Sequence, residues 1–259
     1  MSNRWSADTA LITGATSGIG LAFSHRLAKD GLNLVLVSRS KDKLDALSQT
    51  LEETHKIKVY TLVVDLIQSD AVDIITSFIR EKSCEIDCLI NNAGFDDVGD
   101  FIQTSWQEHQ GMLQAMLTAP SQLCHALIPY MQKRQRGYVI NVGSISALLV
   151  IKGFKRSKSR VLYGAVKAYM IEFTRALANQ FDKDGIRFQA LCPGLTYSEF
   201  HQRSGESDIY ERAPKLFWQT ADQVVAESVS HLQGSDRVVL VTGWINRLLC
   251  QIYRRFCRL

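Results

Sequence analysis

The sequence predicts an α/β protein, a single doubly wound domain with a parallel sheet between two layers of helices. The first observation behind this prediction is that short apolar runs alternate with runs of helical periodicity along the whole chain. The second is that no linker or internal repeat interrupts the alternation. The third is the length, because 259 residues suffice for one large domain with a substantial core. We therefore expect residues 1–259 to form one domain.

Strands are predicted where short apolar runs rich in β-branched residues occur. These runs cover residues 9–13, 32–37, 59–64, 87–91, 137–142, 186–191 and 238–241. Helices are predicted where apolar residues recur every three to four positions. They cover residues 21–28, 41–55, 69–82, 106–134, 161–181, 221–233 and 244–257, and Pro120 is expected to bend the fourth. The segment 195–219 has poor periodicity, and we expect it to cover the substrate.

Composition narrows the class of protein. The 46% hydrophobic and 22% charged residues are globular values, which argue against disorder. No apolar run approaches the roughly 18–20 residues of a membrane span, and the polar start at residues 1–8 lacks the apolar core of a signal peptide. The six cysteines form no C-x-x-C pair, and the six histidines show no metal-ligand spacing. We therefore expect a cytoplasmic protein with reduced thiols and no metal.

Positive charge gathers in two short stretches. Five basic residues and no acid fall within residues 152–160, and four arginines and no acid fall within residues 244–259. The rest of the chain has 21 basic and 26 acidic residues, so no basic face for nucleic acid is expected. The last stretch also carries apolar residues at helical spacing. It suits either an interfacial helix on an anionic bilayer or a helix packed on the domain or on a second subunit.

A glycine-rich turn joins the first predicted strand to the first helix. Its sequence is Thr13-Gly14-Ala15-Thr16-Ser17-Gly18-Ile19-Gly20. Glycines let the backbone turn sharply and approach a pyrophosphate, while the amides of the first helical turn supply donors. The spacing T-G-x-x-x-G-x-G differs from the common G-x-G-x-x-G. A tight turn with glycines needed only for packing is the alternative interpretation.

The second strand ends at Ser38-Arg39-Ser40, where such a unit meets the adenosine ribose. An acid at this place would bind the free 2′-hydroxyl of NAD, and none is present. Arg39, with Lys41 and Lys43 nearby, could instead hold a 2′-phosphate, so we expect the cofactor NADP(H). The alternative is that Arg39 is a solvated charge at a helix entry.

Tyr163 and Lys167 lie four residues apart near the start of the predicted helix 161–181, and so share one helix face. Free tyrosine has a pKa of about 10 and is a poor proton donor or acceptor at neutral pH. A neighbouring ammonium and the positive end of a helix dipole both favour the phenolate. The pair is therefore a candidate acid/base, although this spacing also occurs by chance on solvated helix faces.

Taken together, the motifs resemble the short-chain dehydrogenase/reductase family. They occur in the family's order over roughly residues 8–200. The motifs are the glycine-rich turn, Asp65, Asn91-Asn92-Ala93-Gly94, Ser144, Tyr163-x-x-x-Lys167 and Pro193-Gly194. The resemblance implies a Rossmann domain with a seven-stranded parallel sheet, a nicotinamide cofactor and hydride transfer to or from a carbonyl. Within the family, the chain resembles bacterial ketone reductases of broad specificity and the membrane-linked 3-oxoacyl and hydroxysteroid reductases.

The resemblance also implies residue roles. Tyr163 would exchange a proton with the carbonyl or alcohol oxygen, Lys167 would lower the tyrosine pKa and hold the nicotinamide ribose, and Ser144 would hydrogen-bond the substrate oxygen. The expected cofactor contacts are Gly14, Thr16, Ser17, Gly18, Ile19, Gly20, Ser38, Arg39, Val64, Asp65, Asn91, Ala93, Gly94, Tyr163, Lys167, Pro193, Gly194, Leu195 and Thr196. Val64 and Asp65 would border the adenine, and Leu195 and Thr196 the nicotinamide amide.

Two departures from the family pattern stand out. The family usually places an asparagine in the long helix after N-N-A-G, where it holds a water of the proton relay, and the ungapped count puts Met116 there. A thioether cannot replace an amide that both donates and accepts. The spacing from Ser144 to Tyr163 is also six residues longer than usual, and the extra residues coincide with the basic stretch 152–160. This stretch either steers an acidic substrate or is a solvated insertion.

The leading functional hypothesis is an NADPH-dependent reductase of a lipophilic ketone or 3-oxoacyl group. The expected partners are a small-molecule or acyl-thioester substrate and further copies of the chain, as a dimer or tetramer. A catalytically weak NADP-binding protein that serves regulation or scaffolding is the alternative, motivated by Met116.

Overall fold

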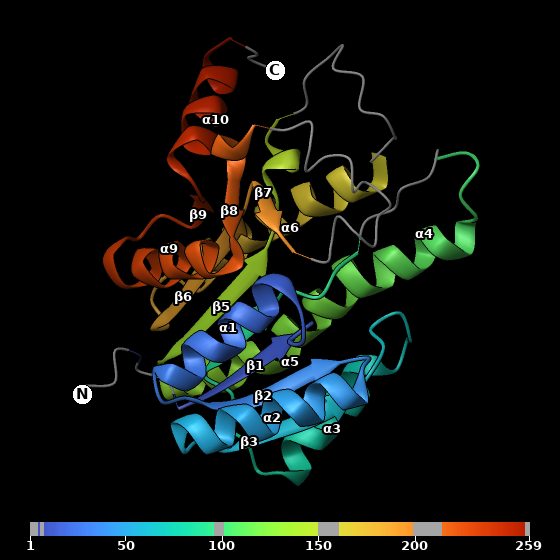
Figure 1. Ribbon diagram of the computed structural model, residues 1–259, viewed down its shortest axis with the longest axis vertical. Coiled ribbons are helices and arrows are strands. Elements are labelled where there is room, and N and C mark those ends of the chain that lie inside the picture. Colours follow the sequence, from blue (N-terminus) through green and yellow to red (C-terminus); the bar gives the residue numbers. More distant parts are fainter. Residues whose placement is uncertain (1–4, 6–7, 96–100, 150–160, 199–213, 257–259) are drawn as a thin grey trace.

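The computed structural model describes residues 5, 8–95, 101–149, 161–198 and 214–256 (Figure 1). Seven strands form one parallel sheet in the order β3-β2-β1-β4-β5-β6-β9. The strands are β1 (Thr9–Thr13), β2 (Asn33–Ser38), β3 (Val59–Val63), β4 (Cys88–Asn91), β5 (Gly137–Val142), β6 (Ile186–Cys192) and β9 (Val239–Val241). The order reverses between β1 and β4, and ligands of such sheets bind at the carboxyl ends of strands at a reversal of this kind. The predicted doubly wound sheet is confirmed.

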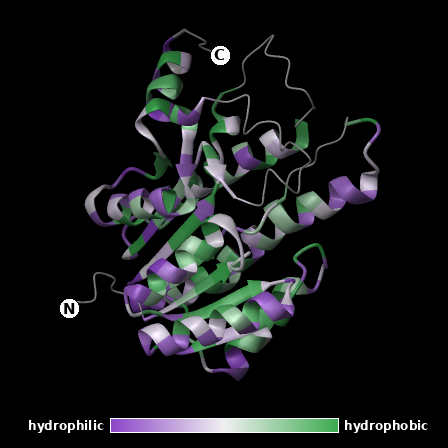
Figure 2. Ribbon diagram, in the orientation of Figure 1, coloured by the Kyte–Doolittle hydropathy of each residue, from purple (hydrophilic) through white to green (hydrophobic). Residues whose placement is uncertain are grey.

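Helices cover both faces of the sheet. They are α1 (Gly18–Lys29), α2 (Lys41–His55), α3 (Ala71–Glu81), α4 (Trp106–Leu113), α5 (Ala119–Arg134), α6 (Val161–Gln180), α9 (Ala221–Gly234) and α10 (Trp244–Phe256). Alternate residues of a strand serve opposite cores: Ile12 packs with α1, α2 and α9, and Leu11 packs with α3, α5 and α6. Figure 2 shows the strands as hydrophobic, whereas the helices carry both classes of residue. None of the helices that the structure describes has the length and apolar character that a membrane crossing requires.

The structure differs from the prediction in two places. The helix predicted over residues 106–134 is interrupted by a π-helical turn, η1 (Gln114–Thr118), directly before α5. Pro120 lies in the first turn of α5, where its missing N–H group is tolerated. Two strands that were not predicted begin within the segment 195–219. They are β7 (Leu195–Tyr197) and β8 (Trp218–Thr220), which pair in parallel as a separate small sheet. Three residues are too few for a periodic signal.

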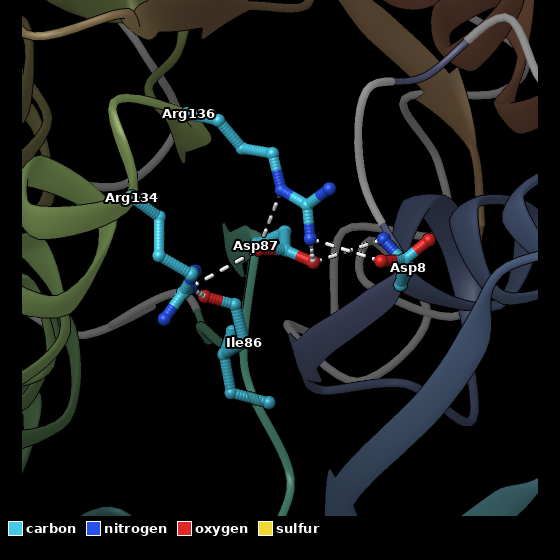
Figure 3. Close-up of polar contacts among 5 residues, drawn as sticks. All are labelled: Asp8, Ile86, Asp87, Arg134 and Arg136. Carbon is cyan, nitrogen blue, oxygen red and sulfur yellow. Dashed lines mark hydrogen bonds and ion pairs between the residues drawn. The ribbon is translucent and has the colours of Figure 1, made fainter.

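A buried carboxylate ties the amino end of β4 to two other parts of the chain (Figure 3). Asp87 is fully buried, and its carboxylate accepts hydrogen bonds from Arg134 at 3.0 Å, from Arg136 at 3.2 Å and from the backbone N–H of Asp8 at 2.9 Å. Arg134 also donates to the carbonyl of Ile86 at 2.8 Å. The buried charge is therefore both paired and hydrogen-bonded, as burial of a carboxylate requires.

Replacement of this carboxylate should destabilise the fold. We expect Asp87→Ala to lower the free energy of unfolding by about 2–3 kcal/mol, because two arginines and a backbone N–H lose their acceptor. Urea unfolding measures the change. Asp45→Ala is the matched control, because Asp45 forms an exposed ion pair with Lys41 and its loss should cost at most about 0.5 kcal/mol. Equal losses for the two variants would contradict a structural role for Asp87.

Candidate active site

A cavity of about 450 Å³ opens at the carboxyl ends of β1, β2, β4, β5 and β6. All the predicted site residues except Gly20 and Asn91 line it. It also contains residues that the sequence did not single out as site residues: Val37, Leu66, Asn92, Phe95, Ala115, Val142, Gly143, Ile145, Ser146, Leu149 and Ser198. The cavity lies where the strand order reverses, which is the expected place for a dinucleotide.

The glycine-rich turn passes so close to neighbouring backbone that side chains have no room. A Cβ atom on Gly14 would lie 2.9 Å from the Cα of Ala93, and Gly14 has a positive φ of 67°. A Cβ atom on Gly20 would lie 2.1 Å from the carbonyl oxygen of Gly14. Gly20 therefore packs within the turn and does not line the cavity. The amino end of α1 follows at Gly18, which does line the cavity.

The two neighbouring asparagines at the end of β4 have different positions. The side chain of Asn91 is buried and donates to Asn141 Oδ1 on β5 at 2.8 Å, away from the cavity lining. Asn92 lines the cavity and donates from its amide to the carbonyls of Thr13 at 3.0 Å and Gly14 at 3.2 Å. Successive residues of a strand point to opposite faces, so this alternation was a usable signal.

The expected adenosine end gathers polar groups from the ends of β1 and β2. The hydroxyl groups of Thr16 and Ser38 are hydrogen-bonded at 2.7 Å. The Arg39 guanidinium is 60% exposed and lies 3.7 Å from the Asp65 carboxylate, beside the same cavity. A cation and two hydroxyl groups at this place suit an anionic group on the ribose, and Asp65 keeps the guanidinium at the cavity edge.

The other end of the cavity contains the candidate acid/base residues. Helix α6 brings Tyr163 and Lys167 to the cavity wall, and both side chains are buried in the protein. The Lys167 Nζ donates to the carbonyl of Val142 at 2.7 Å and lies 5.7 Å from the centre of the Tyr163 ring. Ser144 follows β5, and its Oγ accepts hydrogen bonds from the backbone N–H of Ser146 at 3.1 Å and from its hydroxyl at 2.9 Å. The three predicted catalytic residues therefore share one wall.

Met116 lies in η1, next to Gly94 in the loop that follows β4. Its side chain is buried, and a Cβ atom on Gly94 would lie 3.3 Å from Met116 Cε. The thioether thus packs against the N-N-A-G motif, close to the cavity. The basic stretch 152–160 lies outside the described residues. Within the described ranges, no three His, Cys, Asp or Glu side chains gather as metal ligands.

Comparison with known proteins identifies the family. A family model described as short chain dehydrogenase matches residues 8–208. The chain belongs to this family. The protein is therefore an oxidoreductase of the short-chain dehydrogenase family, whose members use a nicotinamide cofactor.

Three known proteins illustrate the similarity. The chain is 34% identical over 238 residues to hydroxysteroid dehydrogenase-like protein 1 of Gallus gallus, which covers 90% of this chain and 67% of that protein. It is 27% identical over 259 residues to very-long-chain 3-oxoacyl-CoA reductase-A of Danio rerio, with 94% and 74% covered. The structure of a short-chain dehydrogenase from Sphingobium yanoikuyae in complex with NADPH superposes with a TM-score of 0.83 at 28% identity, covering 96% and 93% of the two chains.

The cavity of this short-chain dehydrogenase fits a nicotinamide dinucleotide. The cradle formed by Gly14 and Gly18 leaves backbone amides at the start of α1 for a pyrophosphate. No acidic residue lies in the first turn of α1, so the positive end of the helix dipole is not neutralised there. One end of the cavity presents Arg39, and the other presents Tyr163 and Lys167.

The tight glycine turn leads to a prediction. We expect Gly20→Ala to weaken NADPH binding at least about tenfold and to destabilise the fold by about 1–3 kcal/mol, because the added methyl group displaces the turn. Fluorescence titration with NADPH and thermal unfolding measure the two effects. Gly164→Ala is the matched control, because a Cβ atom on Gly164 meets nothing within 4 Å. If both variants bind NADPH like the unchanged protein, the cradle is not as tight as described.

Proposed function

We propose that this short-chain dehydrogenase is an NADP(H)-dependent reductase of a carbonyl group on a lipophilic ketone or a 3-oxoacyl chain. The observation that carries the proposal is the placing of Tyr163 and Lys167 on one face of α6, in the same cavity as Ser144 and the glycine-rich turn. Acid/base and electrostatic groups meet a dinucleotide cradle there, which is what hydride transfer to a carbonyl requires.

The proposed mechanism assigns one task to each side chain. When bound, the cofactor supplies the hydride that reaches the carbonyl carbon. Ser144 Oγ donates a hydrogen bond to the carbonyl oxygen and stabilises its developing charge. The Tyr163 hydroxyl gives its proton to that oxygen, so the product is an alcohol and the tyrosine becomes a phenolate. The Lys167 ammonium, held by the carbonyl of Val142, stabilises this phenolate until a proton returns from solvent.

The preference for NADP(H) rests on Arg39, Ser38 and Thr16. These side chains meet at the ends of β1 and β2, where the adenosine ribose of such folds lies. A 2′-phosphate would face the guanidinium and the hydroxyl groups. A free ribose would lack the carboxylate that commonly binds its 2′-hydroxyl, because position 39 is an arginine.

The lipophilic substrate is supported by the cavity wall and by the relatives. Phe95, Ile145 and Leu149 add apolar surface to the cavity that contains Ser144 and Tyr163. The zebrafish relative is named a 3-oxoacyl-CoA reductase, and the chicken relative a hydroxysteroid dehydrogenase-like protein. A very-long-chain acyl group and a steroid are both largely apolar, although they differ in shape. The basic stretch 152–160, by sequence, would suit the acidic carrier of an acyl thioester.

A catalytically weak NADP-binding protein is the competing function. It is favoured by Met116, because a thioether stands where the family usually has the relay asparagine. Consumption of NADPH with a panel of hydrophobic ketones and 3-oxoacyl thioesters separates the two functions. Tight NADPH binding without turnover on any substrate would favour the weak binder.

Tyr163 provides the direct test of the mechanism. We expect Tyr163→Phe to lower kcat by about 10²- to 10⁴-fold, because the proton donor is lost while the ring remains. The Kd for NADPH should change little. Stopped-flow turnover and NADPH titration measure the two constants, and Tyr169→Phe on the same helix is the control, since Tyr169 does not line the cavity. Full activity of Tyr163→Phe would contradict the assignment of Tyr163 as the proton donor.

Arg39 provides the test of cofactor choice. We expect Arg39→Asp to weaken NADPH binding by about 10- to 100-fold more than NADH binding, because a carboxylate repels the 2′-phosphate and accepts from a 2′-hydroxyl. Lys41→Asp is the control, since Lys41 does not line the cavity. Equal losses of affinity for the two cofactors would overturn the assignment of the 2′-phosphate to Arg39.

A further inference from the structure

Helix α10 lies at one end of the molecule, far from α2 and α3 (Figure 1). It has an apolar face that is exposed to solvent. Trp244, Leu248 and Ile252 lie at successive four-residue steps and share this face, and all three are exposed. Leu249 on α10 and Leu216 on the neighbouring helical turn η3 (Lys215–Phe217) are exposed as well. We call these five side chains the α10 face. Exposed apolar residues gathered in this way mark an interaction site.

The charges around the α10 face indicate the kind of partner. Lys215, Arg247 and Arg255 are exposed, and no acidic residue follows Asp236 in the sequence. Arg247 lies beside the apolar face, whereas Arg255 comes seven residues after Leu248 and continues the line of the face at the C-terminal end of α10. Glu227 pairs with Arg247 at 2.7 Å, so one of the three positive charges is compensated. Two further arginines, at positions 254 and 258, add to the basic character of the tail. The complementary partner is apolar at its centre and negatively charged at its edge.

We propose that α10 docks the protein onto an anionic lipid surface, with Trp244, Leu248 and Ile252 in the headgroup and acyl boundary. A helix with tryptophan and leucine on one side and arginines beside them has the pattern of interfacial helices. The arginines would reach lipid phosphates, and the anionic leaflet attracts basic residues by about 1 kcal/mol each. A second copy of the chain suits the face less well, because a two-fold contact would bring arginines against arginines.

The opposite side of α10 reaches the active site. Asn246 is buried, and a Cβ atom on Gly194 would lie 2.2 Å from its Nδ2, so the amide packs directly against the Pro193-Gly194 loop of the cavity. Gln219 on β8 donates to Glu227 at 2.8 Å, and Glu227 also accepts from the N–H of Gly243 just before α10. One helix thus joins the proposed lipid surface to the loop that borders the nicotinamide site.

Lipid docking through α10 would give the proposed reductase access to its substrate. The docking proposal rests on the proposed function only in assuming that this substrate is lipophilic. A lipophilic carbonyl compound partitions into a bilayer, and docking through α10 would bring η3, which contacts α10, close to the dissolved substrate. Docking itself requires no turnover, so it can be tested separately.

The test is flotation of the full chain with vesicles of phosphatidylcholine, with or without phosphatidylserine. We expect co-flotation with the mixed vesicles, much weaker flotation with phosphatidylcholine alone, and a blue shift of tryptophan fluorescence on binding. Arg255→Gln should lower the partition coefficient about fivefold, the equivalent of one interfacial charge. Trp244→Ala combined with Leu248→Ala should lower it at least about tenfold.

Trp106→Ala is the matched control. Trp106 is 61% exposed and Trp244 is 63% exposed, and each is the first residue of a helix. The control variant should float like the unchanged protein. Flotation that is equally strong without phosphatidylserine, or that is unchanged by the double substitution, would overturn the proposal. A dimer in solution that dissociates only when Trp244 and Leu248 are replaced would also overturn it, because a second copy of the chain would then cover the α10 face. NADPH-dependent ketone reduction without lipid remains a separate measurement, and its failure would count against the proposed function instead.

Discussion

The contact between the glycine-rich turn and the end of β4 is the constraint on which the site depends. Asn92 donates to the carbonyls of Thr13 and Gly14, and Thr13 Oγ1 accepts from the N–H groups of Asn92 and Ala93 at 3.1 Å. Two strands that are far apart in sequence are thereby locked at the point where the strand order reverses. Gly14 is needed because the two backbones lie too close there for a side chain. The cradle is therefore a product of tertiary packing and not of the turn alone.

A second set of buried hydrogen bonds joins α6, the helix that carries Tyr163 and Lys167, to strands β4 and β5 of the sheet. Asn91 on β4 donates to Asn141 on β5, and Asn141 donates to Thr174 on α6 at 2.9 Å. Thr174 lies on the helix that carries Tyr163 and Lys167. Directional bonds between buried polar groups are costly to break, so they fix how α6 sits on the sheet. In the proposed mechanism, the orientation of Tyr163 and Lys167 by these packed elements is the protein's own contribution to hydride transfer.

Much of this could be predicted from the sequence because the signals are local. Apolar runs located all seven strands of the main sheet, and β1 and β5 have the predicted boundaries. The ordered motifs indicated the family, and they also indicated the cavity wall formed by Ser144, Tyr163 and Lys167. Long-range features had no such signal. The ion pairs of Asp87 join residues 47 to 49 positions apart, and, among the described residues, the three-residue strands β7 and β8 form backbone ladders only with each other.

In the proposed reaction, hydride passes from the nicotinamide to a carbonyl held at Tyr163 and Ser144. The most direct measurement uses NADPH carrying deuterium at the transferring C4 position, together with a hydrophobic ketone and a 3-oxoacyl thioester. We expect one deuterium on the carbinol carbon of the alcohol product, seen by mass spectrometry or NMR, with no deuterium lost to water. NADPH binding without transfer of the label to any carbonyl compound would contradict the account.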